Sequence, residues 1–135
     1  MTMMEALLTA GQRLAEALRA ENEALAALDL GRAAGLADRK IKASDAFAAA
    51  FAAASRTGAR AEGPARQVAE DLTARLQTLG AENRRLLERA VTVQSQVIET
   101  IAGAAMPRRA GAGYGATGRR AVPRQAQPLA LATRA

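Results

Sequence analysis

The sequence predicts an all-α protein in which a long antiparallel helical hairpin, coiled-coil-like in its spacing, precedes a disordered C-terminal tail. In the second half, apolar residues recur at spacings of three and four, as on one face of an α-helix. A similar stripe runs through residues 4–54, and a segment with two glycines and a proline separates the two stripes. Beyond residue 106, glycine, proline, alanine and arginine replace the apolar period.

We expect about residues 4–54 to form one long first helix or two nearly coaxial helices. The leucines of this segment share one side, which Ala43, Phe47 and Ala54 extend in phase. Gly31 and Gly35 each cost about 1 kcal/mol relative to alanine in a helix, so we expect a bend there, and the sequence leaves open whether they break the helix. The leucines of the stripe are Leu7, Leu14, Leu18, Leu25, Leu28 and Leu36.

Residues 55–64 read as a loop, and the second helix is expected over about residues 65–105. Pro64 suits the first turn of that helix, where its missing N–H costs nothing. Two long helices joined by such a loop should fold back on each other, so we expect one domain over residues 1–106. The seam of the second helix contains Leu72, Leu76, Leu79, Asn83, Leu86, Ala90, Val93, Val97 and Ile101.

A second apolar row flanks this seam. Leu87, Val91 and Ile98 lie about 80–120° around the helix from it, at about 100° per residue. A stripe of this width suits contact with a third element, and it is equally compatible with ordinary core packing in a bundle or a homodimer. Asn83, a polar residue in a seam of leucines, predicts a buried group that fixes register, or else a solvated edge beside Gly80.

The positive charge lies in the tail. Residues 1–99 carry equal numbers of acidic and basic residues, so the net charge of +6 comes from arginines after residue 107. We expect residues 107–135 to be a flexible basic tail, because they offer too little apolar area to offset chain entropy. Tyr114 is the chain's single tyrosine and is typical of a short docking motif. One aromatic is little for single-strand nucleic-acid binding, so we expect only weak contacts there.

Composition excludes several classes of function. The chain has no Cys, His or Trp, so a disulfide scaffold and a Cys/His zinc site are ruled out. No arrangement of carboxylates, lysines or hydroxyls resembles a catalytic site, and we expect no enzyme, cofactor or metal. No apolar run approaches the roughly 20 residues of a membrane span, and the N-terminus lacks the pattern of a secretory signal. We expect a cytoplasmic protein.

Three segments in sequence resemble the FlgN-type flagellar export chaperones. Glu21-Asn22-Glu23-Ala24-Leu25, followed by Asp29, Leu36 and Lys40, resembles the first-helix pattern of that family. The stretch 79–105, LGAENRRLLERAVTVQSQVIETIAGAA, resembles its second helix, and Tyr114-Gly115-Ala116-Thr117-Gly118 resembles the Y-G-x-x-G that often follows. Gly31, Gly35 and the arginine-rich tail depart from the family pattern.

The resemblance implies a cytoplasmic chaperone that binds hook–filament junction proteins and delivers them to the export gate of the flagellar type III apparatus. Under this interpretation the second helix binds the client and the tail docks on the gate. A homodimeric structural coiled coil, or a nucleic-acid-binding helical protein acting through its tail, remain the alternatives. The expected client-binding residues are Leu87, Val91, Gln94, Ile98 and Ile101, and the expected gate-docking residues are Tyr114, Gly115 and Gly118.

Overall fold

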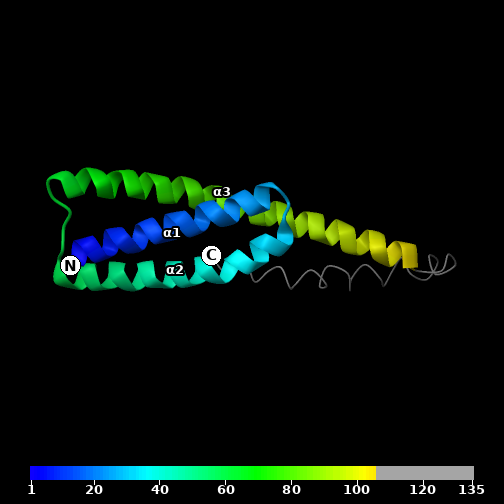
Figure 1. Ribbon diagram of the computed structural model, residues 1–135, viewed down its shortest axis with the longest axis horizontal. Coiled ribbons are helices and arrows are strands. Elements are labelled where there is room, and N and C mark those ends of the chain that lie inside the picture. The colour runs from blue at the N-terminus through cyan, green and yellow to red at the C-terminus, as the bar shows by residue number, and fades with distance from the viewer. Residues whose placement is uncertain (106–135) are drawn as a thin grey trace. The chain divides into compact units, whose positions relative to one another are not determined.

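Three α-helices follow one another in the computed structural model, which describes residues 1–105. They are α1 (Met3–Ala26), α2 (Leu30–Thr57) and α3 (Pro64–Ala105) (Figure 1). The all-α class expected from the sequence is confirmed for the described residues. The tail predicted over residues 107–135 lies outside them.

The chain divides into two compact units, and the boundary falls inside α3, between Leu86 and Leu87. The first unit contains α1, α2 and the part of α3 up to Leu86. The remainder of α3 belongs to the second unit, although α3 is one continuous helix. The single domain expected over residues 1–106 stays a prediction.

The prediction of one helix, or two nearly coaxial ones, over residues 4–54 is wrong, because the chain reverses direction at Ala27–Asp29. Leu28 has a φ of 56°, in the left-handed region, which costs a non-glycine residue about 1–2 kcal/mol. The backbone N–H of Leu28 donates to the carbonyl of Leu25 at 3.0 Å, and that of Asp29 donates to the carbonyl of Ala24 at 2.9 Å. These two bonds close the end of α1 in the manner of a Schellman motif.

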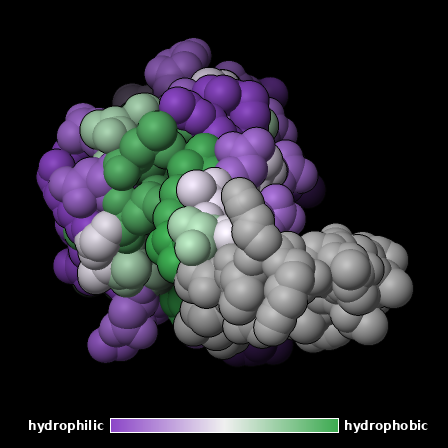
Figure 2. Space-filling model, turned by 90° about the vertical axis from the view of Figure 1, so that its right-hand side faces the viewer, coloured by the Kyte–Doolittle hydropathy of each residue, from purple (hydrophilic) through white to green (hydrophobic). Residues whose placement is uncertain are grey.

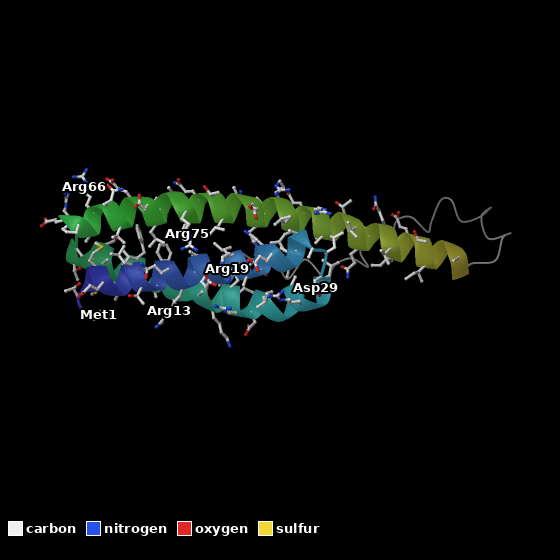
Figure 3. All side chains as sticks on the ribbon, turned by 45° about the horizontal axis from the view of Figure 1, so that its top comes forward. Met1, Arg13, Arg19, Asp29, Arg66 and Arg75 are labelled. Carbon is white, nitrogen blue, oxygen red and sulfur yellow. The ribbon has the colours of Figure 1, made fainter. Side chains whose placement is uncertain are left out.

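Side chains cap the starts of α1 and α2. The Asp29 side chain accepts from the backbone N–H of Arg32 at 3.2 Å and so begins α2 immediately after the turn (Figure 3). At the start of α1, Thr2 and Glu5 form a capping box, with bonds of 2.7 and 3.0 Å. The hydrogen bond from the Thr2 backbone N–H lowers the pKa of the Glu5 carboxyl. Gly31 and Gly35, where the sequence predicted a bend, both lie within α2.

The second connection is shorter than the loop predicted over residues 55–64. α2 continues to Thr57, and Gly58 caps it in the left-handed conformation with a φ of 71°. Gly63 also has a positive φ, of 60°, and Pro64 is the first residue of α3, as the sequence suggested. Positive φ at both ends of the connection favours glycine, which has no Cβ to clash.

Within residues 1–86 the three helices form an up-down-up bundle. α1 and α2 are antiparallel, since Glu21 meets Lys40 and Gly11 lies beside Phe47. α1 and the first part of α3 run in the same direction, since Gly11 also lies beside Leu72 and the Asn22 side chain bonds the carbonyl of Leu79. The structure therefore has three helices in place of the predicted two-helix hairpin. The turn at Leu28 joins α1 and α2, which form an antiparallel pair.

The inner face of α1 is built mainly from small residues, which allows the helices to approach closely. A Cβ atom placed on Gly11 would lie only 2.6 Å from Cδ2 of Leu72 and 3.2 Å from Cε1 of Phe47. Leu18 and Leu25 supply the larger apolar groups of α1. The buried hydrophobic residues of this unit are Ala15, Ala17, Leu18, Ala20, Ala24, Leu25, Ala33, Ala54, Leu72 and Leu86.

Candidate protein-binding surface on α3

A buried polar cluster positions α3 against the other two helices. We define the Glu21 cluster as Glu21 and Asn22 on α1, Lys40 on α2 and Asn83 on α3. Lys40 Nζ donates to Glu21 Oε1 at 2.8 Å and to Asn83 Oδ1 at 3.2 Å. Asn83 Nδ2 donates to Glu21 Oε1 at 2.6 Å and to Asn22 Oδ1 at 2.9 Å. Asn22 Nδ2 completes the network by donating to the carbonyl of Leu79 at 3.2 Å.

All members of the Glu21 cluster are buried, with exposed fractions between 0% and 3%. A charged pair removed from water in this way is stable only when its geometry and hydrogen bonds compensate for the lost hydration. Glu21 Oε2 has no hydrogen-bond partner in the described part of the chain, so the network leaves one acceptor unsatisfied. The hydrogen bonds of Asn83 join α3 to both α1 and α2 and so fix the register of α3. This agrees with the role expected for a buried Asn83.

The C-terminal part of α3 has few charged residues. Between Ala90 and Ala105 the only ionisable side chain is Glu99. Two large apolar side chains are nevertheless exposed on this stretch, Val97 at 50% and Ile101 at 62%. An apolar helix face that meets water on a continuous helix is typical of a surface that binds another protein.

The two exposed residues share one side of the helix with Gln94 and Ile98. The four positions follow the spacing i, i+3, i+4 and i+7, which brings side chains together on one face of a helix. We call Gln94, Val97, Ile98 and Ile101 the α3 end face. Gln94 and Ile98 are half-buried, and Gln94 Oε1 has no hydrogen-bond partner within residues 1–105.

The structure places the predicted client-binding residues in different surroundings. Ile101 is exposed, and Val91, Gln94 and Ile98 are half-buried. Leu87 is only 5% exposed in the free chain, and its role in client binding stays a prediction. The predicted docking residues Tyr114, Gly115 and Gly118 lie outside the described residues.

Val97 is exposed but is not among the client-binding residues predicted from the sequence. Its seam spacing with Val93 and Ile101 suggested that a partner helix would cover it. α3 is much longer than α1 and α2, with 42 residues against 24 and 28. Helices of 24 and 28 residues are too short for either one to match the full length of the α3 seam. The position of the first turn is thus the signal that would have identified Val97.

Figure 2 shows a band of hydrophobic surface bordered by hydrophilic side chains. A face of valine and isoleucine at helical spacing can accept the apolar side of a second amphipathic helix.

In the described residues no group of three or more carboxylates is arranged to hold a metal ion.

No helix in residues 1–105 combines the length and hydrophobicity needed to cross a membrane. Comparison of the chain with protein-family models, with curated proteins and with solved structures gives no match.

Proposed function

We propose that this chain is a cytoplasmic export chaperone of the FlgN type. It would bind hook–filament junction proteins of the flagellum through the α3 end face and deliver them to the flagellar type III export gate. Tyr114, Gly115 and Gly118 would supply the contact with the gate.

The observation that carries the proposal is the exposed apolar face at the end of α3. Full burial of a valine or isoleucine side chain stabilises by about 1.5–3 kcal/mol, and the residues of this face are already partly covered. The face would therefore contribute a few kcal/mol, less than the roughly 8 kcal/mol of a micromolar complex. Contacts of this strength suit a client that must later be released, with further affinity coming from neighbouring parts of the interface.

The residues behind the resemblance support the family part of the proposal. Glu21, Asn22 and Lys40, which belong to the first-helix pattern, meet Asn83 of the second-helix pattern in one buried network. A generic coiled coil repeats apolar seam positions and has no need for these four polar residues. These four polar residues therefore support a specific three-helix arrangement, beyond the helical periodicity that any coiled coil shares.

Replacing Ile101 with aspartate is expected to weaken binding of a junction protein at least about tenfold, because complex formation would bury an unpaired charge. The melting temperature should hardly change, since the side chain is 62% exposed in the free protein. The measurement is isothermal titration of the purified chain with flagellar hook–filament junction proteins, beside a thermal melt of each variant.

Gln96→Asp is the matched control. Gln96 is exposed and lies about 150° around the helix from the centre of the α3 end face, so the same negative charge there should leave affinity within about twofold. Equal affinities for Ile101→Asp and Gln96→Asp would contradict the assigned surface. Absence of any complex with the unmodified chain would contradict the proposed function itself.

A further inference from the structure

The turn between α1 and α2 contains nothing in its own sequence that stops a helix. Ala26, Ala27 and Leu28 belong to the residue types that favour helices most, and no glycine or proline occurs at the turn. Leu28 nevertheless adopts a φ of 56°, a conformation in which glycine is the usual residue. Local preference therefore favours one continuous helix from α1 into α2, and the closed turn opposes it.

Packing between helices maintains the closed turn. α1 folds back on α2, and the Glu21 cluster ties α1 to both α2 and α3 through bonds of 2.6–3.2 Å. All of these groups belong to residues 1–86. None of these contacts requires α1 and α2 to come from the same copy of the chain, since an identical α1 from a second copy would present the same atoms.

We propose that Ala27–Asp29 is a hinge through which two copies of this chain exchange α1. In the exchanged dimer the hinge is helical, α1 and α2 form one long helix, and α1 of each copy packs on α2 and α3 of the other. Every buried contact of the closed chain is regained, so the two forms differ mainly at the hinge. There the strained Leu28 favours exchange, while the entropy of association opposes it. The partner is thus a second copy of this chain, independently of any client.

The buried charge pair provides a test specific for exchange. A Glu21→Lys chain brings two lysines together when closed, and a Lys40→Glu chain brings together two carboxylates. Neither variant alone should show a cooperative thermal transition. In an exchanged heterodimer, each α1 meets a residue of opposite charge on the other copy. Refolding the two variants together should therefore restore a cooperative transition and give a one-to-one dimer.

A second comparison does not depend on the reversed charge pair. Sedimentation equilibrium of the unmodified chain, up to about millimolar concentration, should reveal a dimer. Leu28→Gly should raise its dissociation constant about tenfold or more, because glycine both relieves the left-handed conformation and weakens a continuous helix. Leu28→Ala, which keeps a Cβ and a high helix preference, should not weaken the dimer.

A purely monomeric unmodified chain would overturn the proposal, as would a dimer equally stable in Leu28→Gly and Leu28→Ala. The proposal would also fail if the mixed charge variants showed no cooperative transition and no dimer while the unmodified chain formed a dimer sensitive to Leu28→Gly. That result would show that the hinge influences association without exchange of α1.

Discussion

Replacing Lys40 with methionine is expected to lower the free energy of unfolding by about 3–5 kcal/mol. Lys40 is fully buried, and its ammonium group donates to Glu21 and to Asn83. Methionine fills a similar volume but leaves the Glu21 carboxylate buried without its positive partner. Because domains of this size are stable by only about 5–15 kcal/mol, the loss should be large enough to measure precisely by urea unfolding.

Lys42→Met is the matched control, two residues away on the same helix. Lys42 pairs with Asp38 at 3.0 Å, but both side chains are more than 70% exposed. Exposed pairs of this kind contribute about 1 kcal/mol or less, so the control should remain close to the unmodified protein. If the two variants lost similar stability, the Glu21 cluster would not be an important determinant of the bundle.

Removing both charges should be less harmful than removing one. The double variant Glu21→Gln/Lys40→Met leaves no buried charge, so we expect it to regain part of the stability lost in Lys40→Met. A double variant that is no more stable than Lys40→Met alone would contradict this interpretation of the cluster.

Replacing Gly11 with leucine is expected to destabilise the protein by about 1–3 kcal/mol, because it overpacks the contact between α1 and its neighbours. The first added carbon would already lie 2.6 Å from Leu72, whose side chain is itself buried. The measurement is again the free energy of unfolding in urea, taken at an unchanged m-value.

The same substitution at Gly80 should have the opposite sign. A Cβ at Gly80 meets no other atom within 4 Å, and this glycine lies inside α3. Leucine there should stabilise by up to about 1 kcal/mol through its higher helix preference. Destabilisation of equal size at both positions would show that the close approach at Gly11 has no special energetic role.

α3 was predictable from sequence because its apolar spacing and the residues at its start indicate the same helix. Leu72 and Leu86 lie in the core as the seam required, and Asn83 is buried between them. Pro64 marks the first turn, and Gly58 and Gly63 mark the connection before it. At these positions local preference and tertiary packing favour the same structure.

The first turn was not predictable from the same rules. The local sequence favours a helix through Leu28, and the only local signal for a new start is Asp29, which caps α2. Gly31 and Gly35 pointed to a bend in the wrong place, because a helix tolerates isolated glycines at a modest cost. Here tertiary packing overrides local preference.

The Glu21 cluster could not be identified before the turn was known. Charged residues are seldom fully buried unless they are paired, and the partner of Glu21 lies on another helix. With α1 and α2 as one continuous helix, Glu21 and Lys40 would be about 28 Å apart, at 1.5 Å per residue. Only the reversal at Leu28 brings them into contact at 2.8 Å.

Hydrogen exchange of the chain with and without a bound junction protein tests the central claim most directly. The α3 end face should account for the strongest change, so amides of residues 91–104 should exchange more slowly in the complex. Residues 3–57 should change much less, because α1 and α2 already pack within their own bundle. Slower exchange confined to residues 1–86, with residues 91–104 unaffected, would contradict the account.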